Sequence, residues 1–322
     1  MIQTLEELSD ILKSTVLKSS NIASLEISES SQLAFAIDVP RSTMLDCWHL
    51  LHFVIDVTQM YPILTDFIFS GTGTGRNWHD DLVEEDFFNR FDYKEEQQAG
   101  YFNSVLPESI IDAAKSINGI EAIETRIEQS ERIADETWRE SDWYLYDLEI
   151  TQRNFGISPN PEAAATALNS GKIITEVDFE RWLFNWELNN VPKEQLLAAP
   201  DLTYLEWYDM TSADTIPLLL LPTPNSWDTL ACTHFYGAIN SAEAIAILKY
   251  WYDRYGAELV AHYGTMLQFY VEQKPQTLNE AFELACQHNE FAPSTLILSG
   301  VSIREHARAL LHTERWFLHE KP

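Results

Sequence analysis

The order of strand-like and helix-like segments in this chain of 322 residues predicts an α+β fold, a mixed sheet flanked by helices. Residues 22–27 and 32–39 have the pattern of two short strands around a polar turn. An apolar helical stretch at 43–59 and a buried strand at 63–69 follow them. Strand, helix and strand at this spacing indicate a crossover connection, so we expect part of the sheet to be parallel. Residues 241–322 add the order helix, strand, strand, helix, helix, strand.

The C-terminal block has clear start and stop signals. Ser241 is expected to cap a helix that runs to Tyr255, and Gly256 is expected to end it, because glycine adopts the left-handed conformation of a helix C-terminus without strain. Residues 257–272 are predicted as a hairpin and 316–318 as a final strand. Two helices between them are predicted to begin at capping boxes, at 277–280 and 302–305.

The length fits one large domain or two ordinary ones. Composition shifts along the chain predict three parts. Residues 1–78 form the N-terminal α/β part of the core, 79–215 form an acidic, mainly helical insertion with an aromatic-rich connector, and 216–322 form a C-terminal α+β domain. We expect the three parts to build one composite globule.

The charge of the chain narrows the class of partner. It has 50 acidic against 21 basic side chains, a formal net charge of −29. That excess disfavours nucleic acid and anionic membranes, because both would repel the protein. It favours a basic protein partner, or it serves solubility alone. With 45% hydrophobic residues the chain is able to bury a sizeable core.

Cysteine usage and apolar runs exclude several further classes. Cys47, Cys232 and Cys286 are far apart, which argues against a disulfide scaffold and against a cysteine zinc site. The start of the chain is acidic, unlike a signal peptide, and the longest apolar run, 216–221, is too short to span a bilayer. We expect a cytoplasmic protein that has no cofactor; its oligomeric state stays open.

The strongest binding signal lies in the acidic middle of the chain. Residues 80–150 contain 20 acidic and 6 basic side chains, and apolar residues recur among them at helical spacing. Aromatic side chains stand beside the densest carboxylates, an arrangement that suits a basic partner because carboxylates steer association and aromatic rings anchor it. The predicted partner-binding residues are Trp78, Asp80, Asp81, Glu84, Glu85, Asp86, Phe87 and Phe88. The alternative interpretation is a solvated helical face.

Three other patterns carry weaker chemical hypotheses. Gly71, Gly73 and Gly75 follow a strand but lack the spacing of a nucleotide-binding loop, so a flexible loop is the expectation. On the 43–59 helix, the side chains of His49, His52 and Asp56 share a face that could hold a metal, although a structural role is favoured. The C-terminal His262, His288, His306 and His312, with nearby glutamates, could form a general acid–base site if they share a cleft.

The block W-x2-R-Y-G-A-E, residues 251–258, is followed by P-x-T-x3-A-x2-L-A at 275–285. This order resembles a bacterial domain-of-unknown-function family, number 4253. The resemblance implies a compact domain with Trp251, Arg254, Gly256 and Glu258 as structural motif residues, and it implies no activity. It also suggests proximity to bacterial toxin and immunity systems. The resemblance implies a segment similar to Cys-Pro-Asp after the second helix, but this chain has Phe-Ala-Pro-Ser at 291–294. Chemistry through such a cysteine or aspartate is therefore not expected.

Together these observations favour binding over catalysis. The leading hypothesis is an acidic protein-binding module, most specifically an immunity-type inhibitor of a basic bacterial toxin. The alternatives are a hydrolase-type enzyme that uses the C-terminal histidines and glutamates, and a structural or regulatory protein without catalysis.

Overall fold

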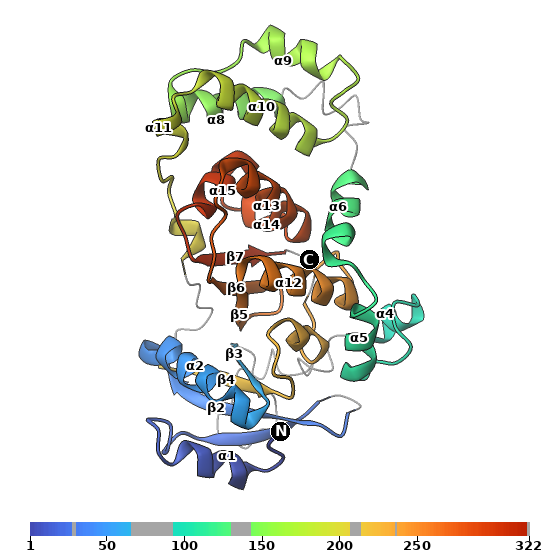
Figure 1. Cartoon of the computed structure of the whole chain (residues 1–322), viewed down its shortest axis with the longest axis vertical. Helices are drawn as coiled ribbons and strands as arrows, with labels where there is room; N and C mark the ends of the chain where they lie inside the picture. The colour runs from blue at the N-terminus through green and yellow to red at the C-terminus, as the bar shows by residue number, and fades with distance from the viewer. Residues whose placement is uncertain (28–29, 66–92, 130–142, 207–213, 236, 321–322) are drawn as a thin grey trace. The chain divides into compact units, whose positions relative to one another are not determined.

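The computed structural model describes residues 1–27, 30–65, 93–129, 143–206, 214–235 and 237–320, and it confirms the α+β class (Figure 1). The predicted binding segment from Trp78 to Phe88, and the Gly71–Gly75 loop, lie outside these residues.

Seven strands among the described residues form one mixed sheet in the order β1-β2-β4-β3-β5-β6-β7. Their bounds are β1 Ile22–Glu26, β2 Leu33–Pro40, β3 Tyr61–Leu64, β4 Thr215–Leu221, β5 Ala257–His262, β6 Met266–Val271 and β7 Arg315–His319.

The expected parallel element lies at the centre of this sheet. β4 is antiparallel to both of its neighbours, β2 and β3, so β2 and β3 point the same way with β4 inserted between them. β3 in turn runs parallel to β5, where Leu64 is opposite Ala261. The central strands are apolar and buried on both faces, as expected where helices cover a sheet.

The N-terminal helices are shorter than their sequence patterns. α1 (Leu5–Leu12) begins at a capping box formed by Thr4 and Glu7. The stretch predicted as one helix at 43–59 forms a 3₁₀ turn at Arg41–Thr43, then α2 (Met44–Phe53) and α3 (Ile55–Thr58). Gln59, at φ 56°, ends α3 in the left-handed conformation just before β3.

Short helices make up the described part of the middle of the chain. They are α4 Tyr93–Gln98, α5 Pro107–Ala114, α6 Gly119–Gln129, α8 Trp143–Phe155, α9 Pro161–Leu168, α10 Glu176–Asn190 and α11 Lys193–Leu196, with 3₁₀ turns at Thr203–Leu205 and Trp227–Ala231. The C-terminal helices are α12 Ser241–Tyr255, α13 Leu278–Phe291, α14 Ser294–Ile297 and α15 Ile303–Leu310.

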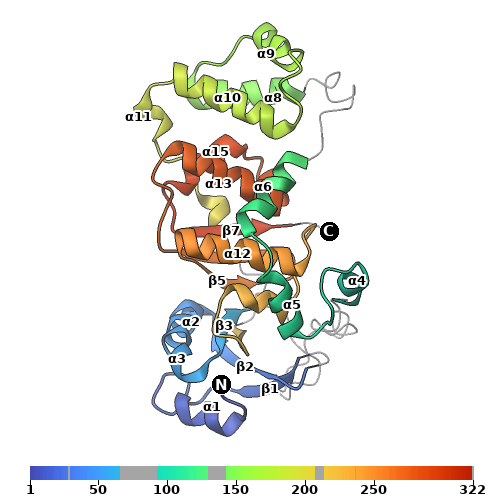
Figure 2. The same cartoon turned by 45° about the vertical axis from the view of Figure 1, so that its right-hand side comes forward.

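The chain forms two compact units. One comprises residues 1–120, 207–272 and 319–322, and the other 121–206 and 273–318. In the first unit, Trp251 of α12 is fully buried, and its ring meets Phe269 of β6 edge-on at 6.5 Å. In the second unit, α8, α9 and α10 lie side by side in both views (Figures 1 and 2). They share a small apolar core of Leu148, Ala164, Leu168, Ile173, Phe179 and Leu183.

The C-terminal block matches most of its sequence signals, with two differences. At 277–280 the Thr277 side chain accepts the hydrogen bond from the backbone nitrogen of Glu280, which is one half of the expected capping box, and the Glu280 carboxylate accepts from the backbone nitrogen of Gln276. α12 and the β5–β6 hairpin have the expected extents, and Ser302 forms the expected capping box with Glu305. The N-cap of α12, however, is Asn240 and not Ser241, because the Asn240 side chain accepts the hydrogen bond from the backbone nitrogen of Glu243. Gly256 ends α12 at φ 60°, as predicted.

We predict that Gly256→Ala destabilises the protein for two reasons. An L-residue at this φ costs about 1–2 kcal/mol, and a Cβ would lie 2.7 Å from Cβ of Glu272. Gly300→Ala is a matched control, because Gly300 has φ +63° and nothing within 4 Å of an added Cβ. Urea unfolding of both variants should show a larger loss for Gly256→Ala; equal losses would mean that Glu272 moves aside without cost.

Candidate functional site

A half-open pocket of about 260 Å³ lies in the first unit, beside the β3–β5 junction. Its walls come from the end of α2, from α3, β3, the 3₁₀ turn after β4, α12 and β5. The side chains that matter for its chemistry are His52, Asp56, Tyr61, Trp227, Tyr252 and Glu258. Elements that are far apart in sequence meet here because β3 is parallel to β5, which brings α2 next to the start of β5.

His52 and Glu258 form the polar centre of the pocket. The Nε2 atom of His52 lies 3.0 Å from Oε2 of Glu258, and the side chains are 31% and 27% exposed, so solvent or a ligand is able to reach them. The imidazole stacks on Trp48 with ring centroids 4.8 Å apart, and Trp48 donates a 2.8 Å hydrogen bond to the carbonyl of Pro62. The histidine ring is therefore held in place by packing before any ligand binds.

Tyr61 contributes a buried hydroxyl. It is 2% exposed, and its ring meets that of His52 edge-on at 5.8 Å. Burial raises the pKa of Tyr61 well above its ordinary value, and the Glu258 carboxylate raises it further. The hydroxyl therefore keeps its proton at neutral pH.

The outer part of the pocket combines aromatic faces with carboxylates. The rings of Trp227 and Tyr252 are 4.5 Å apart at their centroids, and Asp56 and Glu258 are the two carboxylates that line the same space. Aromatic faces and carboxylates both attract cations, and Lys249 already lies 5.4 Å from the Trp227 ring centroid. The arrangement suits an ammonium or guanidinium group.

The histidines singled out at the C-terminus do not share one cleft. In the second unit, Nδ1 of His288 lies 3.0 Å from Nε2 of His306, and Nδ1 of His306 lies 2.7 Å from the hydroxyl of Tyr204. His262 belongs to the first unit, where its ring contacts Thr233 and the carbonyl of Gly264. His312 contacts the carbonyl of Leu197.

Burial decides the protonation of His262, His288 and His306. His262, His288 and His306 are fully buried. Burial lowers the pKa of His262 and of His306 to about 3, and it lowers the pKa of His288 well below its ordinary value, with His306 adding to the effect. They stay neutral at physiological pH, unlike a general acid–base group poised near pH 7.

The weaker hypothesis of a metal site at His49, His52 and Asp56 finds no support in the described residues. His49 is exposed, and His52 is engaged by Glu258. Over the described ranges, no group of three or more His, Cys, Asp or Glu side chains could hold a metal ion.

The family-motif residues take different roles in the structure. Trp251 packs in the core, and Gly256 ends α12. Arg254 is exposed, with its guanidinium 5.7 Å from the Tyr255 ring centroid. Glu258, interpreted from sequence as a structural residue, lines the pocket and pairs with His52. No local sequence signal links two residues so far apart.

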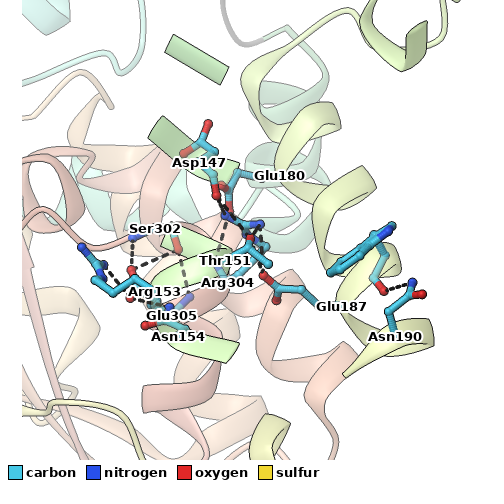
Figure 3. Close-up of polar contacts among 11 residues, drawn as sticks. Asp147, Thr151, Arg153, Asn154, Glu180, Glu187, Asn190, Ser302, Arg304 and Glu305 are labelled. Atoms are coloured by element: carbon cyan, nitrogen blue, oxygen red, sulfur yellow. Dashed lines mark hydrogen bonds and ion pairs between the residues drawn. The ribbon is translucent and has the colours of Figure 1, made fainter. Parts of the chain in front are cut away.

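A second polar cluster is built around Arg304 in the other unit (Figure 3). Arg304 is 2% exposed. Its Nε lies 3.2 Å from Oε2 of Glu180, and its Nη1 lies 3.1 Å from Oε1 of Glu187 and 3.0 Å from Oγ1 of Thr151. Its Nη2 donates to the carbonyl of Asp147 at 3.3 Å. One guanidinium therefore joins α15, α10 and α8.

The carboxyl groups in this cluster are held at a cost. Burial raises the pKa of Glu180 and of Glu187, although Arg304 acts in the opposite direction. Burial, and then the charge of Glu180, raise the pKa of Asp147 to about 8, so this carboxyl holds a proton at neutral pH. Arg304 donates four side-chain hydrogen bonds within this cluster, which indicates a structural role.

The fold and the pocket define an α+β protein with a preformed, aromatic-walled polar pocket. Residues 217–319 match the model of the family DUF4253, Domain of unknown function, which confirms the resemblance noted in the sequence. No curated protein and no solved structure matches the chain. Among the described helices, none is both long and apolar enough to cross a membrane.

We predict that Arg304→Met destabilises the protein by about 3–5 kcal/mol, because Glu180 and Glu187 would stay buried without their cation. The matched control is Arg181→Met, which removes the half-exposed pair with Glu283 and should cost about 1 kcal/mol or less. Chemical denaturation measures both. A recovery in Arg304→Met/Glu180→Gln/Glu187→Gln would attribute the loss to the buried carboxylates; equal losses in the two single variants would contradict the buried-pair argument.

We also predict acid destabilisation through His306. The unfolded chain takes up a proton near pH 6.5, whereas the folded state keeps this ring neutral down to about pH 3. Stability therefore falls as pH falls between these values, by about 1.4 kcal/mol per pH unit for this group. His306→Gln should flatten the measured dependence of unfolding free energy on pH. Tyr204→Phe, which removes a hydrogen bond but no group that titrates between pH 3 and pH 6.5, should lower stability across this range and leave the slope unchanged.

Proposed function

We propose that this protein is an acidic protein-binding module that associates with a basic partner protein. The observation that carries the proposal is the formal net charge of −29, from 50 acidic and 21 basic side chains. A charge of this size steers a basic protein toward the surface and accelerates encounter, and it repels nucleic acids. In its most specific form the partner is a basic bacterial toxin and this protein is its immunity-type inhibitor.

The pocket in the first unit supports the proposal with an anchor point. Charge alone speeds association but contributes little to residence time, which depends on groups that are buried at the centre of an interface. The Trp227 and Tyr252 rings, with Asp56 and Glu258, offer a lysine or arginine side chain both aromatic faces and carboxylates. A preformed wall also lowers the entropic cost of binding, because Trp48 already holds His52 in position.

The buried histidines give indirect support. A binding protein has no need of a proton-transfer group, and His262, His288 and His306 are neutral and inaccessible at physiological pH. The segment from Trp78 to Phe88 remains the predicted steering surface and lies outside the described residues.

The test begins with the tagged protein in its own host, purified at low and at high salt, followed by titration of the isolated basic partner. We expect the affinity to fall steeply as salt rises, because the attraction is between opposite charges. The double variant Asp56→Asn/Glu258→Gln should weaken binding by about tenfold or more. The control Glu162→Gln/Glu194→Gln removes two exposed charges that do not line the pocket and should weaken binding by less than about threefold.

Two results would count against the proposal. One is a partner that is itself acidic or neutral. The other is an affinity for the basic partner that does not change with salt. If the two double variants weaken binding equally, charge steering stands but the pocket is not the anchor.

One observation favours a second candidate, a hydrolase-type enzyme. The His52–Glu258 pair is 3.0 Å apart, partly exposed and next to the Tyr61 ring, so it has the geometry of a general acid–base pair. In the described part of the chain, no serine or cysteine side chain hydrogen-bonds to His52. This enzyme would therefore activate water. Turnover of chromogenic ester, glycoside or phosphate substrates that is lost in both His52→Asn and Glu258→Gln would favour it over binding.

A further inference from the structure

Arg308 is a buried cation with no carboxylate bound to it. It lies on α15, is 7% exposed, and rests with its Cζ 4.7 Å from the ring centroid of Phe155. Its Nε is buried and has no hydrogen-bond partner, and no described carboxylate lies within ion-pair distance of its guanidinium. Burial lowers its pKa, whereas Glu187 and Glu305, at longer range, raise it. An arginine that is buried and unpaired is costly in a folded protein.

The neighbouring arginine on the same helix shows what is missing. Arg304 is four residues earlier on α15 and binds both Glu180 and Glu187. Those carboxylates satisfy Arg304 and leave none for Arg308. The chain has 50 acidic side chains, so the missing carboxylate beside Arg308 does not reflect a lack of acidic residues in the sequence. The position of Arg308 is therefore better explained by a ligand that supplies the anion.

Arg308 lines a cavity of about 610 Å³ in the second unit. Arg153, Asn154, Asp201 and Glu305 contribute polar groups to the same cavity, and an apolar wall includes Ala198, Ala199, Pro200 and Val301. This volume is within the range of small-molecule sites, which combine apolar walls with a few polar groups.

The two carboxylates of the cavity are already engaged. Glu305 accepts hydrogen bonds from Asn154 at 2.8 Å and from the backbone of Ser302 at 3.0 Å, and it pairs with Arg153 at 3.1 Å (Figure 3). Asp201 accepts from the backbone nitrogen of Thr203 at 2.9 Å. Arg308 is thus the uncommitted cation of the cavity, and the carboxylates nearby set a limit on how much negative charge a ligand brings.

We infer that this cavity binds a small organic carboxylate, whose carboxyl oxygens accept hydrogen bonds from Arg308 and whose apolar body packs on the wall of Ala199, Pro200 and Val301. A guanidinium matches a carboxylate in planar, two-point geometry. A single negative charge suits the site better than a phosphate dianion, because Glu305 and Asp201 lie in the same cavity. The inference concerns the second unit and does not depend on the proposed basic partner.

The test is calorimetric titration of the full chain with sodium butyrate, butylammonium chloride and sodium phosphate at matched ionic strength. We expect saturable binding of butyrate with a dissociation constant on the order of 1 mM. We expect no binding of butylammonium, and weaker binding of phosphate than of butyrate.

Three variants locate the site. Arg308→Met should reduce butyrate affinity at least tenfold and should keep or raise the melting temperature, because it removes an unpaired cation; this separates loss of the site from loss of the fold. Ala199→Trp fills the cavity from its exposed side, leaves Arg308 in place and should also abolish binding. Arg181→Met, elsewhere on the same unit, should bind butyrate as the wild type does.

The inference is overturned if butyrate does not bind, or if Arg308→Met binds it normally. Tighter binding of phosphate that disappears in Arg308→Met would keep Arg308 as an anion ligand and overturn the choice of a carboxylate.

Discussion

The ion pairs of Arg304 are the interaction on which the second unit depends. Helices α8 and α10 direct polar groups at the one guanidinium that α15 carries, and two of those groups are carboxylates that burial would otherwise neutralise. A chain so rich in acid and so poor in base has few cations with which to compensate buried carboxylates. The positions at which this chain buries an arginine are therefore informative about the fold. Arg304 has its anions supplied by the protein, and Arg308, one helical turn later, does not.

The first unit solves a different problem with aromatic packing. Trp48 stacks on His52 and orients it, and the Tyr61 ring packs edge-on against the same histidine. Trp251 of α12 packs against Phe269 of the β5–β6 hairpin. Large rigid rings fix polar groups at little entropic cost, since few torsions have to be ordered. The pocket is consequently ready before a ligand arrives, which suits either a recognition surface or a catalytic one.

The sequence identified those features that depend on near neighbours. Gly256 as a helix end, Ser302 as a cap and the β5–β6 hairpin all follow from signals within a few residues, and all three are present. The cap of α12 was predicted one residue too late, because Asn240 and Ser241 are both good capping residues and Asn240 is the one that caps the helix. The His52–Glu258 pair and the ion pairs of Arg304 were invisible, because their partners are more than a hundred residues apart and meet only through sheet order and helix packing. Periodicity reports which face a side chain occupies, not which distant group lies opposite it.

The position of β3 determines how much of the chain is needed for a complete sheet and a complete pocket. The family match begins within β4, so it includes Trp227, Tyr252 and Glu258 but neither β3 nor α2. A polypeptide limited to the matched segment would lose His52 and Tyr61, and it would also leave the inner edges of β4 and β5 without a strand between them. Such apolar, unsatisfied edges recruit other chains, and the outcome is self-association instead of a smaller soluble domain. The N-terminal third thus supplies β3, which covers the edges of β4 and β5, as well as one wall of the pocket.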